Sequence, residues 1–370
     1  MSIKDIFCQD RAINKLKSAL AIDRLAHAYI FAGADGVGKF KTAREWAKLL
    51  TCNDEMSKGH DPDSCGKCRS CILFESDGHA DFHHIYKELK RYTRKGKKED
   101  TPLDLPKSVI DEFLIEKIAA APVMGSHVVY VISEAEKLNR SSQNTLLKVL
   151  EEPPANCVII LLCSRVDKLL PTTLSRCQVL QFGPIDEQII VEKLIQTGVA
   201  VSEATYWARF SEGSMGTAMA WAKLEPKETS CYAIKTELLE RLCKYQPGES
   251  LDLAEWVCAA AKKIGTAWSE IEADVSKKDI TRRAQKGLLQ MITAVFTDVM
   301  RSALDGEAVL VNSDQARLIE GMQQRFDPEK AAEQVDIIAE KARWIDANVN
   351  EKLIFDELLL NLSGCGTISL

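Results

Sequence analysis

The sequence predicts an α/β protein in which a parallel sheet is followed by helices alone. Apolar strand-like segments alternate with helical patterns over about the first 180 residues, as in proteins with a parallel sheet. The first of these segments, 28–31, leads into a glycine-rich turn of the kind that binds phosphate. Beyond Pro184 the apolar spacing is helical only. We therefore expect an α/β domain over 1–183, a small helical lid domain over 184–228 and an all-helical domain over 229–370.

Composition and charge argue against some classes of function. The chain carries 48 Lys and Arg against 54 Asp and Glu, and this net charge of −6 argues against strong nucleic-acid binding over the whole surface. No run of about 18 apolar residues could span a bilayer, and the N-terminal residues, with Lys4 and Asp5, lack the apolar core of a signal peptide. We expect a cytoplasmic protein with no membrane partner. Its twelve cysteines fit a reducing compartment.

The glycine-rich turn lacks one part of a phosphate-binding loop. Gly33, Gly36 and Gly38 allow the backbone to aim N–H groups at a phosphate, and Lys39 would reach the outer phosphates. The hydroxyl that should follow this lysine to help hold magnesium is replaced by Phe40. The turn could drive chemistry or only shape the fold. Binding of ATP and magnesium is left open by these residues.

Four cysteines form a metal-binding pattern after the next predicted helix, in a module at about 52–71. The spacing is Cys-x12-Cys-x2-Cys-x2-Cys, formed by Cys52, Cys65, Cys68 and Cys71. Four thiolates complete the tetrahedral coordination of zinc and leave no open position, so the zinc should be structural. The alternative is four structural or redox thiols. Four histidines could compete as ligands: His60, His79, His83 and His84.

A basic run occupies residues 87–98, after a short predicted strand at 81–86. Its Lys and Arg side chains are interleaved with Tyr86 and Tyr92. One interpretation is a solvated loop, and the other is contact with a phosphate backbone or an acidic partner surface. The sequence does not decide between them.

The next strand, 127–132, is nearly continuous in apolar residues, as expected of a parallel strand covered on both faces. In a nucleotide hydrolase, an aspartate that supports magnesium and a glutamate that polarises water follow such a strand. Here Ser133 stands at the aspartate position and Glu134 at the glutamate position. Glu134 could act as a base, but its acidic partner is missing.

The α/β pattern ends with a helix and two more strands. The helix at 141–152 is halted by Pro153 and Pro154, and the strands are predicted at 157–163 and 179–182. Long amphipathic segments follow, and we assign the apolar stripe of one of them to the core or to a subunit interface. That stripe consists of Leu288, Met291, Ile292, Val295, Phe296 and Val299.

Three segments resemble bacterial DNA polymerase III clamp-loader subunits of the AAA+ class: His-Ala-Tyr-Ile-Phe at 27–31, Gln-Asn-Thr-Leu-Leu-Lys-Val-Leu-Glu-Glu-Pro-Pro at 143–154, and Leu-Ser-Arg-Cys at 174–177. The four-cysteine module is similar to that of gamma/tau and delta-prime subunits. Residues 348–353 look like the start of the last helix of the family's collar domain. The resemblance spans essentially the whole chain and implies an AAA+ domain with a P-loop, a lid and an oligomerising collar.

The resemblance implies that Arg176 is an arginine finger that acts in trans, in the ATP site of a neighbouring subunit. A planar, permanently charged guanidinium can stabilise the charge that develops on phosphoryl oxygens. Phe40, Ser133 and Thr217 depart from the ATPase members, since a lid arginine usually stands at the position of Thr217. The chain therefore resembles the delta-prime type, with its own ATP hydrolysis weak or absent.

The same resemblance implies a role in DNA replication and a set of partners. These are gamma/tau-type and delta-type clamp-loader subunits, the sliding clamp, and primer-template DNA within the complex. The chain would belong to a polymerase holoenzyme without being the polymerase. Two alternatives are a gamma/tau-like ATPase motor of the same complex and an AAA+ ATPase that loads another replication factor.

Overall fold

The computed structural model describes residues 2–54, 59, 61–97, 102–225, 229–273 and 275–362. Its contacts divide the chain into two compact units. The first unit contains Met1–Ile189 and Gly213–Thr217, and the second contains Ile190–Glu212 and Ala218–Leu370. The three predicted domains, 1–183, 184–228 and 229–370, stay a prediction.

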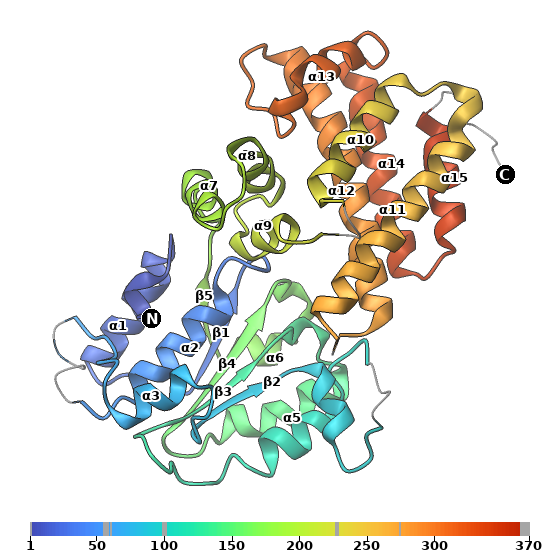
Figure 1. The fold of residues 1–370 in the computed structure, drawn as a ribbon. Helices are drawn as coiled ribbons and strands as arrows, with labels where there is room; N and C mark the ends of the chain where they lie inside the picture. The colour runs from blue at the N-terminus through green and yellow to red at the C-terminus, as the bar shows by residue number, and fades with distance from the viewer. Residues whose placement is uncertain are drawn as a thin grey trace. The chain divides into compact units, whose positions relative to one another are not determined.

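A parallel sheet forms the centre of the first unit (Figure 1). In the part of the chain that the structure describes, its strand order is β2-β3-β4-β1-β5. The strands are β1 (Ala28–Ala32), β2 (Phe82–Ile85), β3 (Val128–Ile132), β4 (Cys157–Cys163) and β5 (Gln178–Gln181). Strands β1, β3 and β4 are buried along their whole length, which explains why their sequences are almost wholly apolar. The predicted parallel α/β architecture is confirmed.

Helices cover both faces of this sheet, so alternate strand residues point into two separate cores. On one face Tyr29 and Phe31 pack with α1 (Asp10–Ala21), α2 (Lys39–Leu50) and α3 (Arg69–Glu75). On the other face Ala28 and Ile30 pack with four segments. These are α4 (Lys107–Ile110), the π-helical turn Asp111–Ile115, α5 (Arg140–Glu151) and α6 (Pro171–Leu174). Short 3-10 helices lie at Ile3–Asp5, Lys87–Tyr92, Ala135–Lys137 and Val166–Lys168.

Beyond β5 the described residues are helical, as predicted. The helices are α7 (Glu187–Gln196), α8 (Val201–Phe210), α9 (Met215–Ala222), α10 (Cys231–Lys244), α11 (Ser250–Ile271), α12 (Lys277–Leu304), α13 (Ala316–Gln323), α14 (Pro328–Asp346) and α15 (Glu351–Leu362), with 3-10 turns at Pro247–Glu249 and Ser313–Gln315. Among the described helices, none combines the length and the apolar character needed to cross a bilayer.

The core of the second unit is built around α12, which packs against α11, α13 and α14. Its apolar stripe from Leu288 to Val299 is buried, so its assignment to the core is confirmed. Aromatic rings of α8 and α9 extend this core. Trp221 stacks on Trp207 at 5.7 Å between ring centroids and meets Trp268 of α11 edge-on at 4.6 Å. These aromatic contacts pack Trp207 of α8 on Trp221 of α9, and Trp221 against α11, within the second unit.

Candidate nucleotide-binding loop and metal centre

The glycine-rich turn connects β1 to α2 and requires its glycines for two different reasons. Gly36 and Gly38 have φ angles of 76° and 101°, in the left-handed region that side chains other than glycine seldom adopt. Gly33 is required by space instead, because a Cβ there would overlap the carbonyl oxygen of Phe182. These three glycines are therefore required by the backbone and the space of the turn, whereas phosphate binding at the turn stays a prediction.

Lys39 is turned back into this loop. Its Nζ donates to the carbonyl oxygens of Gly33 at 2.6 Å and Ala34 at 2.7 Å, and it lies 3.2 Å from a carboxylate oxygen of Asp35. The side chain is buried. An incoming phosphate would have to replace these three partners before the lysine could bind it.

Residues 213–217, which we call the loop clasp, close over the turn within the first unit. The Ser214 hydroxyl donates to the carbonyl oxygen of Asp35 at 2.7 Å, and the Gly216 N–H donates to that of Gly36 at 3.0 Å. A Cβ on Gly36 would overlap Ser214 Oγ. The hydroxyl of Thr217 lies 2.7 Å from that of Ser214. The clasp thus contacts the turn through two hydrogen bonds, to the carbonyl oxygens of Asp35 and Gly36.

His84 contacts both Phe40 and Ser133, the two residues at which the sequence analysis expects magnesium ligands to be missing. Its ring centroid lies 4.5 Å from that of Phe40, and its Nε2 is 2.8 Å from the hydroxyl of Ser133. Tyr86 covers the same imidazole, with ring centroids 4.9 Å apart. From the sequence, His84 is a candidate only as a competing zinc ligand, and no sequence pattern indicates its position between Phe40 and Ser133.

Burial lowers the pKa of His84 to about 4, so the imidazole is neutral at neutral pH. Magnesium requires nearly octahedral oxygen coordination. At this site Phe40 offers a benzyl ring and no oxygen ligand, and the hydroxyl of Ser133 is already engaged by His84. These residues therefore do not fit a magnesium ion held in the usual way.

Glu134 lies directly after β3 and Ser133, with a left-handed backbone at φ 52°. Its carboxylate forms ion pairs with Lys137 and with Lys87, the latter at 3.7 Å. Two ammonium groups thus compensate its charge, which is unlike the arrangement of a free general base aimed at a water molecule.

Arg176 follows α6 and is 34% exposed. Its Nη2 forms an ion pair with Oε1 of Glu151 at 2.8 Å, and its Nη1 donates to the carbonyl oxygen of Thr172 at 3.0 Å. The structure thus brings together the Leu-Glu-Glu-Pro-Pro and Ser-Arg-Cys segments. Among the described residues, the partners of Arg176 come from α5, from α6 and from the adjacent Ser175, and not from the glycine-rich turn.

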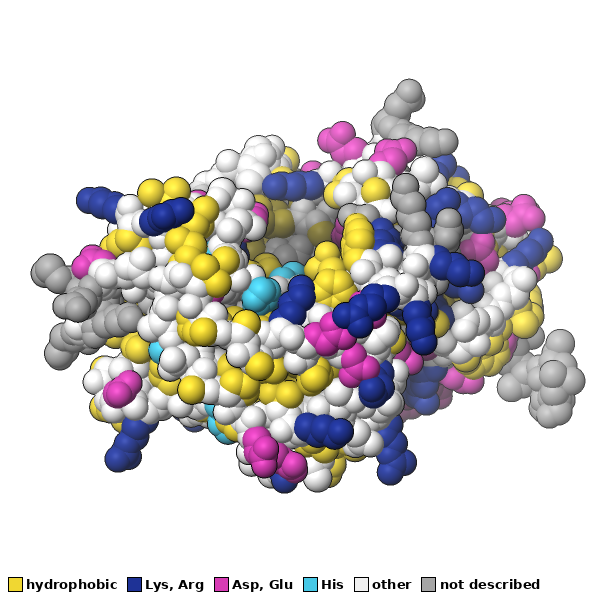
Figure 2. Space-filling view, turned by 90° about the horizontal axis from the view of Figure 1, so that it is seen from below, with side chains coloured by type: hydrophobic (Ala, Val, Ile, Leu, Met, Phe, Trp, Pro, Cys, Tyr) yellow, Lys and Arg dark blue, Asp and Glu magenta, His cyan; other side chains and the backbone are white. Residues whose placement is uncertain are grey.

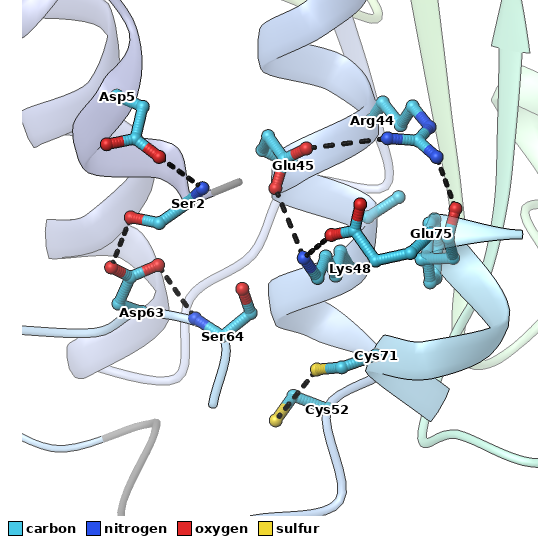
Figure 3. Close-up of polar contacts among 12 residues, drawn as sticks. Ser2, Asp5, Arg44, Glu45, Lys48, Cys52, Asp63, Ser64, Cys71 and Glu75 are labelled. Carbon is cyan, nitrogen blue, oxygen red and sulfur yellow. Dashed lines mark hydrogen bonds and ion pairs between the residues drawn. The ribbon is translucent and has the colours of Figure 1, made fainter. Parts of the chain in front are cut away.

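The four predicted cysteines form one cluster in which all sulfur atoms lie within 4.8 Å of one another. Sγ of Cys52 lies 3.9 Å from that of Cys68 and 3.8 Å from that of Cys71, and Sγ atoms of Cys65 and Cys71 are 4.0 Å apart (Figure 3 shows the Cys52 and Cys71 pair). Zinc bonds of about 2.3 Å in a tetrahedron place sulfur atoms about 3.8 Å apart. The spacing fits zinc and is about twice that of a disulfide.

Within the cluster, local hydrogen bonds favour the thiolate of Cys68, whereas burial raises the pKa of Cys71. Cys68 caps the N-terminus of α3 and accepts a hydrogen bond from the N–H of Cys71, which lies in its first turn. Burial opposes ionisation of Cys68, but hydrogen bonds that favour the thiolate outweigh it and lower the pKa to about 7. All four cysteines of this cluster were predicted from their spacing in the sequence.

The histidines nearby have other partners. His79 bonds to the Ser70 hydroxyl at 2.9 Å and accepts from the N–H of Asp81, and His83 stacks on Tyr130. His60 lies outside the described residues. Among the described residues, His79, His83 and His84 are therefore not part of the metal-binding cluster.

Some basic side chains of the run at 87–98 are buried or paired with a carboxylate. Lys87 is buried, and Arg94 forms an ion pair with Glu116 at 2.5 Å. On the face shown in Figure 2, Lys and Arg side chains lie among acidic and apolar ones. Residue 98 lies outside the described residues, and contact of this run with DNA stays a prediction.

Comparison with known proteins gives consistent matches. A family model described as "DNA polymerase III, delta subunit" matches residues 8–186, and one described as "DNA polymerase III, delta subunit, C terminal" matches residues 277–364. The chain is similar to DNA polymerase III subunit delta′ of Bacillus subtilis, with 25% identity over 354 residues that cover 96% of each chain. It is also similar to subunit tau/gamma of Haemophilus influenzae, with 35% identity over 190 residues, 51% of this chain and 25% of that protein.

Among solved structures, the chain is similar to a DNA polymerase III gamma-subunit-related protein from Thermotoga maritima. The sequence identity is 14%, the TM-score is 0.43, and the match covers 95% of this chain and 99% of that one.

Proposed function

We propose a function for this chain from the family to which it belongs, the delta-prime family of DNA polymerase III clamp-loader subunits, which acts in DNA replication. The chain hydrolyses little or no ATP itself, and it completes the ATP site of a neighbouring subunit. Its proposed partners are gamma/tau-type and delta-type subunits, the sliding clamp, and primer-template DNA within the complex. Arg176 is the proposed arginine finger, and its exposure supports this role.

The observation that carries the proposal is the position of His84 between Phe40 and Ser133. Catalysis of phosphoryl transfer depends on a metal ion that is accurately placed between the phosphates. A neutral imidazole and a benzyl ring supply no oxygen ligands for that ion. Glu134, already paired with two lysines, gives no separate support for hydrolysis and is interpreted as vestigial.

Weak binding of nucleotide without turnover is compatible with the same residues. Gly33, Gly36 and Gly38 give the turn a backbone that could bind phosphate, and Nζ of Lys39 lies inside the loop. The lysine is held by three partners in the loop, so bound phosphate would compete with them. Whether nucleotide is bound should be measured apart from its hydrolysis.

The test is ATP turnover measured on the chain alone and in a complex reconstituted with gamma/tau-type and delta-type subunits. We expect negligible turnover by the chain alone. Arg176→Ala should lower clamp-dependent turnover by the complex at least about tenfold, since an arginine finger contributes orders of magnitude at its own site. Arg11→Ala, at an exposed position of α1 in the same unit, is the matched control. Normal clamp loading by the Arg176→Ala complex would refute the arginine-finger role.

The second candidate function is a gamma/tau-like ATPase motor, which the intact glycine-rich turn and Lys39 favour. In that case the isolated chain should hydrolyse ATP, and Lys39→Ala should abolish the activity. An AAA+ ATPase that loads another replication factor would instead be identified by the partners that copurify with the tagged chain.

We also propose that the four-cysteine cluster holds a structural zinc ion, and the spacing of its sulfur atoms supports this. Metal analysis of protein prepared without chelator should find about one zinc per chain. Replacing Cys68 and Cys71 by Ser should remove it, whereas Cys8→Ser, at an exposed thiol, should not. Metal-free wild-type protein from that preparation would contradict the assignment.

A further inference from the structure

We propose that Glu151 is a positioning residue that orients the guanidinium of Arg176 toward the neighbouring subunit's ATP. The inference rests on the proposed arginine-finger role. It concerns a residue that the sequence marked only as part of the Leu-Glu-Glu-Pro-Pro segment. The observation behind it is the ion pair between Glu151 Oε1 and Arg176 Nη2 at 2.8 Å.

Glu151 lies at the end of α5 and Arg176 lies just after the end of α6, so the ion pair forms where these two helices end. Glu151 is the last residue of α5, which cannot continue through Pro153 and Pro154. Arg176 follows the short helix α6, and its Nη1 is bound to the carbonyl oxygen of Thr172 in that helix. One contact thus comes from the chain segment that carries Arg176, and the other comes from α5. Together they fix the guanidinium at two of its nitrogen atoms.

The pair is better suited to orientation than to stabilising the fold. Glu151 and Arg176 are 51% and 34% exposed, and ion pairs between exposed side chains contribute little to folding. An exposed arginine has many rotamers, however, and ordering it before its partner binds reduces the entropy lost on binding. The C-terminal end of α5 adds its own negative dipole to the carboxylate, which strengthens the attraction for a cation.

The ion pair leaves the guanidinium able to bind a phosphate. An arginine has five N–H donors, and the pair joins a single nitrogen to a single carboxylate oxygen. Other donors can meet a phosphoryl oxygen while Glu151 and Thr172 hold their contacts. Removing the Glu151 charge should therefore release the guanidinium into several orientations without removing it.

The experiment compares Glu151→Gln, Arg176→Ala and the double variant in the reconstituted complex, with Glu152→Gln as the matched control. Glu152 is the adjacent carboxylate, and it caps the same helix. We expect Glu151→Gln to lower the kcat of clamp-dependent ATP turnover by about threefold to tenfold with little change in KM, because the Thr172 contact remains and a misplaced group loses up to about 100-fold. Glu152→Gln should behave as wild type. In the Arg176→Ala background, Glu151→Gln should have no further effect.

The outcomes separate this inference from the proposed function. If Arg176→Ala leaves turnover unchanged, the arginine-finger role fails and the role of Glu151 fails with it. If Arg176→Ala is defective but Glu151→Gln is normal or faster than wild type, only the positioning role is overturned. An equal loss from Glu151→Gln in both backgrounds would also overturn it, since Glu151 would then act without Arg176. Size-exclusion chromatography of each complex distinguishes these results from loss of assembly.

Discussion

Replacing His84 by Gln should make the chain less sensitive to acid. In the folded chain the pKa of His84 is about 4 because burial disfavours the imidazolium, whereas the ordinary value is 6.5. The unfolded chain therefore binds a proton more readily than the folded chain between these two values. The stability that comes from neutral His84 is fully present above about pH 6.5 and is lost as the pH falls toward 4. A glutamine can still bond to Ser133 but cannot titrate.

The size of the effect follows from the two pKa values. Their separation corresponds to about 3 kcal/mol when both states have passed through their titrations. Between pH 7 and pH 5 the unfolded chain has largely titrated and the folded chain has not, so wild type should lose about 2 kcal/mol more than His84→Gln. His79 and His83, whose pKa values burial also lowers, are present in both proteins and so cancel in the comparison.

Two measurements check this prediction. Urea unfolding of both proteins at pH 7 and pH 5, followed by circular dichroism, gives the difference in the free energy of unfolding. An NMR titration of histidine-labelled wild type gives the pKa of His84 directly. The reasoning is refuted if His84 titrates at 6 or above, or if both proteins lose equal stability on acidification. Either result would mean that the imidazole is not enclosed between Phe40 and Ser133.

Two pairs of glycine substitutions test the close contacts in the two units. Gly36→Ala should destabilise the chain by about 2 to 4 kcal/mol in urea unfolding, because a left-handed backbone and overlap with the clasp serine act together. Gly38→Ala, with the same strain but open space, should cost only about 1 to 2 kcal/mol, and equal effects would show that the clasp is not closed. Gly287→Ala would overlap the Trp221 ring and should lower stability by about 1 to 3 kcal/mol. Gly321→Ala, in open space on α13, should raise stability by up to about 1 kcal/mol, and an equal rise from Gly287→Ala would exclude close packing on Trp221.

Most of the first unit follows from local sequence patterns. The buried strands β1, β3 and β4 are nearly continuous apolar runs, and such runs indicate parallel strands whatever lies beside them. The cysteine cluster is also local, because a two-residue gap and one helical turn bring three of its four thiols together. The left-handed backbone at Gly36 and Gly38 is expected from residue type alone.

The chemical character of the site was decided by contacts between residues far apart in the chain. The sequence indicated that Phe40 and Ser133 stand where nucleotide hydrolases are expected to carry magnesium ligands, but not that His84 of β2 would lie between them. Spacing cannot reveal this, because the contact depends on β2 pairing with β3 and on the packing of α2 over the sheet. The clasp on Gly36 depends in the same way on a segment that returns after α8.

The sequence by itself determined the parallel α/β fold, the glycine-rich turn, the four thiols and the residue types missing from the turn. Only the tertiary structure decided that His84 lies between Phe40 and Ser133 and that Arg176 meets Glu151. The physical reason is that periodicity and spacing report the burial and backbone conformation of neighbouring residues. Hydrogen bonds and ion pairs across elements depend on how those elements pack, and local patterns do not specify that packing.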